Sequence, residues 1–90
     1  MRYMVIEKYR AGPGPVYARV AERGRMLPAG LSHVDSWIDA GGLDRCFQLV
    51  EADDPSLFDQ WMGNWNDLVE FEIVPVITSA EAAARAAGGG

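Results

Sequence analysis

Four stretches of the chain alternate with period two, so that successive side chains point to opposite sides, as in β-strands. The first covers residues 2–9, where tyrosine, valine and glutamate occupy one side and methionine and isoleucine the other. The others cover residues 32–39, 43–51 and 69–78, and glycine, proline, asparagine and aspartate are frequent between the stretches. We therefore predict four β-strands over these ranges.

The segment between the first two strands carries apolar residues at helical spacing. Pro15 suits the first position of a helix, and Val20 and Leu27 lie on its apolar face. Gly24 weakens this helix, and Pro28 is expected to end it. The sequence thus predicts a helix that begins at Pro15 and stops before Pro28.

A second helix is predicted between the third and fourth strands. Asp53 and Asp54 offer a capping carboxylate and favourable negative charge at its start, and Pro55 suits the first turn. The helix is expected to run to about Asn66. Its apolar residues follow the three-four spacing and should supply much of the core: Leu57, Phe58, Trp61, Met62, Trp65 and Leu68.

The predicted order is strand, helix, strand, strand, helix, strand. The short connection through Gly41 and Gly42 implies that the second and third strands form an antiparallel hairpin. Right-handed crossovers applied to this order give an α+β domain of ferredoxin-like βαββαβ topology, with a four-stranded antiparallel sheet and both helices on one face. Pro75 cannot donate a ladder hydrogen bond, so the fourth strand is expected at an edge of the sheet.

Residues 1–78 are expected to form this ferredoxin-like domain. Thr78 and Glu81 have the spacing of a capping box ahead of an alanine-rich run, which predicts a short helix. Three glycines end the chain. We therefore expect residues 79–90 to form a short C-terminal helix and a flexible glycine tail.

The face of the sheet that the helices leave free is expected to be too apolar to stay in contact with water. Strand parity assigns the following residues to this face: Tyr3, Val5, Glu7, Tyr9, Asp35, Trp37, Cys46, Gln48, Val50, Glu72, Val74 and Val76. A domain of 90 residues also has a thin core. We therefore expect a homodimer in which two sheets pack against each other.

Charge and composition disfavour several classes of partner. The net charge is −5, and the eight Lys and Arg residues are scattered, which opposes binding to nucleic acid or to an anionic membrane. No apolar run has the length of a membrane span. Cys46 is the single cysteine, which fits a reducing cytoplasm, and no residues have a recognised metal-ligand spacing, so we expect a cytoplasmic protein without a metal site.

Six segments resemble, in order and over nearly the whole chain, a bacterial family known as domain of unknown function 3303: MVIEKY, GRMLP, VDSW, RCFQLVE, ADDPSLFDQW and EIVPVITSAEAAAR. That family is similar to the dimeric alpha-plus-beta barrel group, which includes cofactor-free monooxygenases, muconolactone isomerases and polyketide cyclases or dehydratases. The resemblance implies a dimeric α/β barrel, no cofactor and a small-molecule site between the two sheets. It does not specify a reaction, because one fold hosts many functions.

Glu7 and Glu72 are the candidate catalytic residues. Both are predicted to lie on the free face, where enclosure between two sheets would raise the pKa of a carboxyl group. If the two carboxyl groups are close, one remains a neutral acid beside a charged base. The alternative interpretation is that each is a solvated charge at a strand end or at the rim.

The candidate substrate-binding residues are Tyr3, Asp35, Trp37, Gln48 and His33. Trp37 and Tyr3 can stack on a flat ligand or anchor a dimer interface. Gln48 needs a hydrogen-bond partner if it is buried, either across the dimer or on a ligand. His33 titrates near neutrality but has no nucleophile near it in sequence, so a structural role is the alternative.

Arg23 and Arg25 lie near the end of the first predicted helix, where positive charge is favourable. Anion binding is the alternative interpretation.

Two functions remain open. In one, the homodimer holds a cofactor-free catalytic site for a small, partly aromatic or polyketide-like molecule. In the other, it is a non-catalytic ligand-binding or structural module. A cavity of a few hundred cubic ångströms would favour the first, and a filled space the second.

Overall fold

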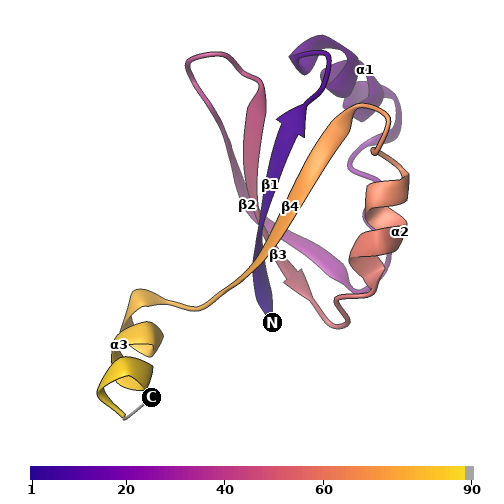
Figure 1. Ribbon diagram of the computed structural model, residues 1–90. Helices are drawn as coiled ribbons and strands as arrows, with labels where there is room; N and C mark the ends of the chain where they lie inside the picture. The colour runs from indigo at the N-terminus through magenta and orange to yellow at the C-terminus, as the bar shows by residue number, and fades with distance from the viewer. Residues whose placement is uncertain (89–90) are drawn as a thin grey trace.

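The computed structural model describes residues 1–88 of the chain. Its elements follow the order β1 (Arg2–Tyr9), α1 (Pro13–Arg23), β2 (Leu31–Ile38), β3 (Arg45–Ala52), α2 (Leu57–Gly63), β4 (Val69–Val76) and α3 (Ser79–Ala87) (Figure 1). The predicted βαββαβ order is therefore confirmed. The strands begin and end at the predicted residues or within two of them.

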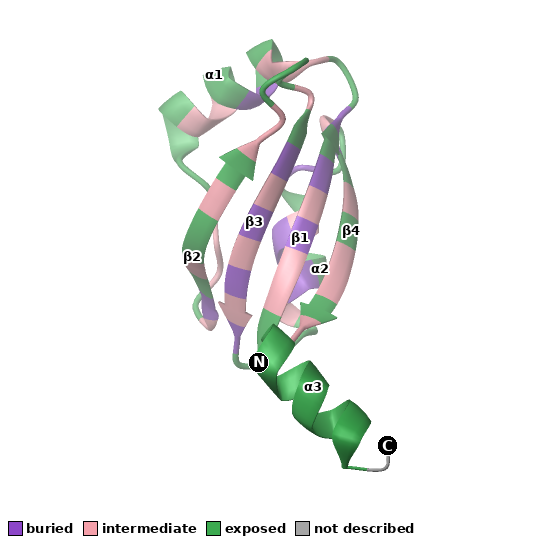
Figure 2. Cartoon of the chain, turned by 90° about the vertical axis from the view of Figure 1, so that its left-hand side faces the viewer, coloured by how far each residue is buried: buried purple, intermediate pink, exposed green. Residues whose placement is uncertain are grey.

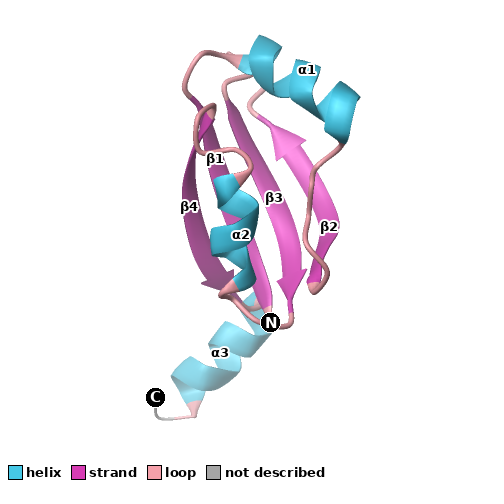
Figure 3. Cartoon of the chain, turned by 90° about the vertical axis from the view of Figure 1, so that its right-hand side faces the viewer, coloured by secondary structure: helices cyan, strands magenta, loops and turns pink. Residues whose placement is uncertain are grey.

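The four strands form one antiparallel sheet in the order β2-β3-β1-β4. Helices α1 and α2 both lie against one face of this sheet (Figure 3). β4 is an edge strand, as Pro75 predicted, and the ferredoxin-like fold is confirmed. Within the described residues, no helix is both long enough and apolar enough to cross a membrane.

The core lies between the sheet and the helices. Val5 in β1 and Val50 in β3 are completely buried and belong to the same hydrophobic cluster as Phe58 and Trp61 of α2. Figure 2 shows buried residues recurring at every second position along β1 and β3. This alternation is what a sheet covered on one face requires.

The assignment of β1 and β3 residues to the two faces of the sheet was wrong. Seven residues predicted for the free face lie on the helix-covered face: Tyr3, Val5, Glu7, Tyr9, Cys46, Gln48 and Val50. The free face carries the opposite parity, including Met4, Ile6, Phe47 and Leu49. Both strands are central and apolar on both sides, so alternation separates two sets of residues without telling which set the helices cover.

The prediction for the edge strands was correct at most positions. Trp37 pairs with Phe47, and Glu72 pairs with Ile6, so these side chains lie on the free face. Asp35, Val74 and Val76 also lie there, since they pair with Leu49, Met4 and Arg2.

A β-bulge in β2 changes the direction of His33. The register shifts between His33 and Asp35, which leaves Val34 as the extra residue. As a result His33 faces the helices together with Ser36, rather than sharing a side with Asp35 as strict alternation predicted.

Both core helices have different bounds from those predicted. α1 begins two residues earlier, at Pro13, and ends at Arg23 because Gly24 adopts a φ of 67°. α2 begins at Leu57 and ends at Gly63 rather than near Asn66. Asn64 and Trp65 donate backbone hydrogen bonds to residues three positions earlier, so the chain leaves the α-helix through tighter turns.

The C-terminal helix α3 projects away from the domain and buries none of its residues (Figures 1 and 2). Its predicted capping box is present: the Glu81 backbone N–H donates to Thr78 Oγ1 at 3.1 Å, and the Glu81 carboxylate accepts from the Thr78 N–H. Gly89 and Gly90 of the predicted flexible tail lie outside the described residues.

Candidate functional site

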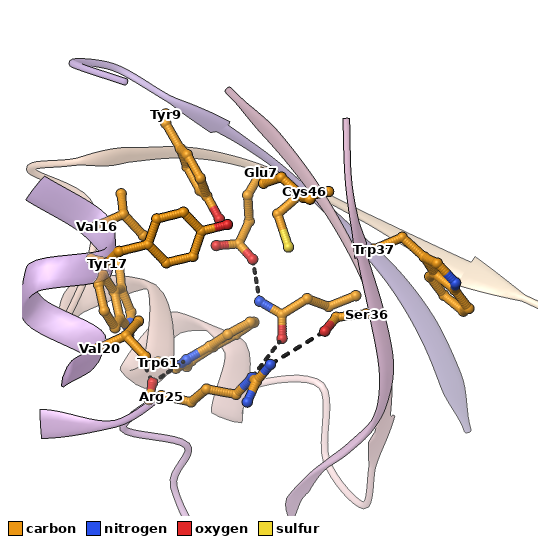
Figure 4. Close-up of a pocket in the computed structure, with 13 residues that line it drawn as sticks. Glu7, Tyr9, Val16, Tyr17, Val20, Arg25, Ser36, Trp37, Cys46 and Trp61 are labelled. Carbon is orange, nitrogen blue, oxygen red and sulfur yellow. Dashed lines mark hydrogen bonds between the residues drawn. The ribbon is translucent and has the colours of Figure 1, made fainter. Parts of the chain in front are cut away.

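A cavity of about 220 Å³ lies between α1 and the helix-covered face of the sheet, beside the β2 edge (Figure 4). Three strands (β1, β2 and β3), helices α1 and α2, and the segment after α1 contribute to it, together with Trp65 beyond α2. Its lining residues are Glu7, Tyr9, Val16, Tyr17, Val20, Arg25, Ser36, Trp37, Ile38, Cys46, Gln48, Trp61 and Trp65. The cavity therefore belongs to the interior of one chain, not to the free face on which a site was predicted.

Glu7 and Gln48 form the polar centre of this cavity. Register places Glu7 of β1 opposite Cys46 of β3, so Gln48, two residues along β3, points to the same side. The Gln48 side-chain amide donates a hydrogen bond to Glu7 Oε2. Glu7 is 5% exposed and Gln48 6%, so this carboxyl group is one of the few polar groups inside the core.

Burial raises the pKa of Glu7 to about 7, although the Gln48 hydrogen bond and the positive charge of Arg25 act in the opposite direction. A carboxyl group with this pKa is present in both protonation states at neutral pH. It can therefore either accept or donate a proton, which is the property required of a general base or acid.

Arg25 extends the network from Gln48 to the edge of the cavity. Its Nε donates to Gln48 Oε1 at 3.4 Å, and its Nη2 donates to Ser36 Oγ at 3.2 Å. The Gln48 amide thus accepts from Arg25 and donates to Glu7 (Figure 4). This arrangement fixes which end of the amide faces the carboxylate.

The backbone of Arg25 is held by two tryptophans. The indole N–H groups of Trp61 and Trp65 both donate to the Arg25 carbonyl oxygen, each at 3.0 Å. Asn64 Nδ2 donates to the next carbonyl, that of Met26, at 3.2 Å. The segment after α1 is therefore fixed against α2 and the turn that follows it, which places the Arg25 side chain beside the cavity.

Tyr9 and Cys46 form part of the wall beside Glu7. Burial, with a smaller contribution from the Glu7 carboxylate, raises the pKa of the Cys46 thiol to about 11. Burial also raises the pKa of the Tyr9 hydroxyl above its usual value. Both groups remain protonated at neutral pH, whereas Glu7 changes charge there.

Three residues predicted for the site lie elsewhere. Tyr3 packs edge-to-face on Phe58, with ring centroids 5.0 Å apart, outside the cavity. Asp35 is exposed on the free face, where its carboxylate accepts the Ser36 N–H at 2.8 Å. Glu72 is exposed on that face as well, so the predicted pair of Glu7 and Glu72 is not formed.

Trp37 and His33 lie at the margin of the site. Trp37 lines the rim, but its side chain is 52% exposed and points away from the cavity in Figure 4. His33 Nε2 is buried and has no hydrogen-bond partner among the described residues. Burial lowers the pKa of His33, and the nearby charge of Arg25 lowers it further. His33 does not line the cavity.

Of the predicted site residues, the structure brings together Glu7 and Gln48, with Trp37 at the rim. Arg25 was predicted only as a helix-end charge or an anion ligand, and neither Ser36 nor Tyr17 was among the predicted substrate-binding residues. Tyr17 follows Val16 on α1, and its ring meets that of Tyr9 edge-on at 6.3 Å. The sequence signal that could have identified Tyr17 is its position as an aromatic residue next to the apolar face of the first helix.

A family model described as "Domain of unknown function (DUF3303)" matches residues 1–90, which is the entire chain. The chain belongs to the DUF3303 family. Comparisons with curated proteins and with solved structures found no match. The DUF3303 family predicted from the six segments is thus confirmed. Among those described, no three His, Cys, Asp or Glu residues are placed to hold a metal ion.

Proposed function

We propose that this DUF3303 protein binds a small, flat organic molecule in the cavity, and that Glu7 transfers a proton on that molecule without a cofactor. The observation that carries the proposal is the buried Glu7 carboxyl group, hydrogen-bonded to Gln48 at the edge of an aromatic-lined space. The cavity is smaller than the ~300–1,000 Å³ of sites for drug-sized ligands, which favours a molecule with one ring.

The reaction class that fits is proton transfer at a carbon next to a carbonyl group. The Glu7 carboxylate removes the proton: a C–H bond breaks, its electron pair forms an enolate, and an O–H bond forms on Glu7. Glu7 then returns the proton to the same carbon or to another, which gives exchange or isomerisation. The Gln48 amide orients the carboxylate, and Tyr9 and Trp61 limit the access of water.

The test uses phenylacetone, a one-ring ketone with exchangeable benzylic hydrogens. Deuterium uptake at that carbon in D2O is followed by proton NMR with the wild-type protein and with Glu7→Gln. We expect Glu7→Gln to lower the protein-catalysed rate by about 10²-fold or more, the usual contribution of a general base. The matched control is Glu22→Gln, which changes an exposed carboxylate on α1 and should leave the rate unchanged.

Two results would contradict the catalytic proposal. One is an exchange rate with the wild-type protein that equals the rate in buffer. The other is an equal rate with Glu7→Gln and Glu22→Gln. If phenylacetone nevertheless quenches tryptophan fluorescence saturably, the non-catalytic binding module is the correct function.

We further propose that the chain forms a homodimer through the free face of the sheet. This face presents partly buried apolar side chains from three strands, namely Met4, Ile6, Phe47, Leu49, Val74 and Val76. Charges of both signs surround them, which suits a self-complementary interface between identical copies. The single free Cys46 supports a location in the reducing cytoplasm.

A further inference from the structure

The cavity contains one positive and one acidic side chain. Among its lining residues, Arg25 is the only cation and Glu7 the only carboxylic acid. When Glu7 is protonated, the wall has a net positive charge from Arg25. The electrostatics of the cavity therefore favour an anionic ligand over a neutral one.

The Arg25 guanidinium has N–H groups that its hydrogen bonds to Gln48 and Ser36 do not use. A guanidinium group has five N–H donors. In the described part of the chain, Arg25 uses Nε on Gln48 and Nη2 on Ser36, and Nη1 donates to neither. Its free N–H groups form a planar fork that matches the two oxygens of a carboxylate.

Trp61 and Trp65 keep this fork in place. Because both indoles donate to the Arg25 carbonyl oxygen, the backbone that carries the guanidinium is fixed before a ligand arrives. Ser36 and Gln48 then restrain the side chain itself. A group ordered in advance loses less entropy on binding, so its contribution to affinity is larger.

We infer that the cavity selects a planar aromatic carboxylate, whose carboxylate is bound by Arg25 while the ring extends along the aromatic wall toward Glu7. The inference rests on the proposed function and adds the charge of the ligand to it. Arg25 is then the specificity-determining residue, and Trp61 and Trp65 are positioning residues.

This arrangement couples ligand binding to the protonation of Glu7. An anion at Arg25 repels the Glu7 carboxylate and neutralises the cation that favours it. Binding of a carboxylate should therefore weaken as the pH rises through about 7, where Glu7 ionises. Tyr9 and Cys46, which also face Glu7, stay protonated in this range. His33 and Asp35 lie outside the cavity, and burial lowers the pKa of His33.

The test compares benzoate with benzamide, which has nearly the same shape and no charge. Dissociation constants are measured by tryptophan fluorescence at pH 6 for the wild-type protein, Arg25→Gln and Arg23→Gln. We expect the wild type to bind benzoate about tenfold more tightly than benzamide, as one charge-assisted contact at a partly exposed site provides. Arg25→Gln should reduce this ratio to about one. Arg23→Gln, an exposed cation outside the cavity, should preserve it.

Three more variants test separate parts of the inference. Arg25→Lys retains the charge without the fork, and should keep only part of the preference for benzoate. Trp65→Phe removes one indole donor, and should weaken benzoate binding more than benzamide binding, whereas a general loss of packing would weaken both equally. In Glu7→Gln, the affinity for benzoate should no longer change between pH 6 and pH 8.

Equal affinity of the wild type for the two compounds would overturn the inference, as would a preference for benzoate that survives Arg25→Gln. Binding of benzamide in each variant shows that the cavity is intact, so either result would leave the proposed function in place. If neither compound binds while phenylacetone exchange is catalysed, the anion selectivity is wrong and the proton transfer stands. If exchange is absent as well, both proposals are wrong.

Discussion

Glu7 makes the stability of the fold depend on pH. Its pKa is about 7 in the folded chain and 4.5 for an ordinary glutamate, so the folded state binds the proton more tightly than the unfolded state. Below pH 4.5 both states are protonated and stability is unaffected. As the pH rises from 4.5 to 7, Glu7 ionises in the unfolded chain but stays largely protonated in the folded chain, so the free energy of unfolding falls; above 7 the loss is constant. At about 1.4 kcal/mol per pKa unit, the loss is ~3 kcal/mol.

We therefore expect Glu7→Gln to be more stable than the wild type at pH 8 and nearly equal to it at pH 4.5. The amide retains a hydrogen-bonding partner for Gln48 and carries no charge. Urea unfolding at a series of pH values measures the free energy of unfolding of the wild type and of the variant. His33 contributes equally to both, so its contribution cancels in the difference between them. Parallel curves for the wild type and the variant would show that Glu7 is not the titrating group.

The sequence allowed Glu7 and Gln48 to be placed on one side of the sheet, because strand alternation and strand order suffice for that. The sequence did not indicate that the helices cover this side, because Met4 and Ile6 on the other side of β1 are as apolar as the residues that alternate with them. The approach of Arg25 could not be predicted either. It depends on the path of the chain after Gly24 and on two indole hydrogen bonds from distant residues.

At the scale of elements, Gly30 controls how closely the segment before β2 approaches α2. Its φ is +98°, and a Cβ at this position would lie 2.6 Å from Leu57 Cδ1. We expect Gly30→Ala to lower the free energy of unfolding by about 1–3 kcal/mol, through backbone strain and displacement of Leu57. Chemical denaturation at fixed pH measures this change.

Gly14→Ala is the matched control for this prediction. Gly14 lies in the first turn of α1, and a Cβ there would meet no atom within 4 Å. Alanine is the better helix former, so this variant should be as stable as the wild type or more so. Equal effects of the two substitutions would contradict the role assigned to Gly30.

Element order was predictable because each strand and helix has its own periodicity, whereas element ends depended on single residues. The hairpin of β2 and β3 formed as its short glycine connection indicated. Helix α1 ends at Arg23, earlier than predicted, because the backbone of Gly24 lies outside the helical region. The bulge at Val34 makes His33 point to the opposite side from the predicted one. Neither the helix end at Gly24 nor the bulge at Val34 changes the pattern of apolar residues from which the elements were predicted.

Helix α3 should be dispensable for the stability of the domain. None of its residues is buried, and its visible support is the capping box of Thr78. We expect a chain that ends at Thr78 to unfold at the same temperature as the full chain, within about 2 °C, while its circular dichroism loses helical signal. A fall of several degrees at equal protein concentration would show that α3 contributes to the fold.

At the scale of the whole molecule, the free face should determine the oligomeric state. We expect the wild-type chain to sediment at twice its mass at micromolar concentration, and Leu49→Lys to sediment as a monomer with unchanged circular dichroism, because a charge in the middle of the apolar face cannot be buried. Val34→Lys is the control, since Val34 lies at the bulge of the β2 edge and is already 46% exposed. A monomeric wild type would contradict the homodimer.

The cavity and the apolar face lie on opposite sides of one sheet, so β1 and β3 would separate the proposed ligand from the proposed second copy. Residues that line the cavity and residues of the apolar face alternate along these two strands, so neither set should need to move for the other to bind. The two sites of a pair should then fill independently. A titration with benzoate should give a Hill coefficient of about one, with the same midpoint at every protein concentration.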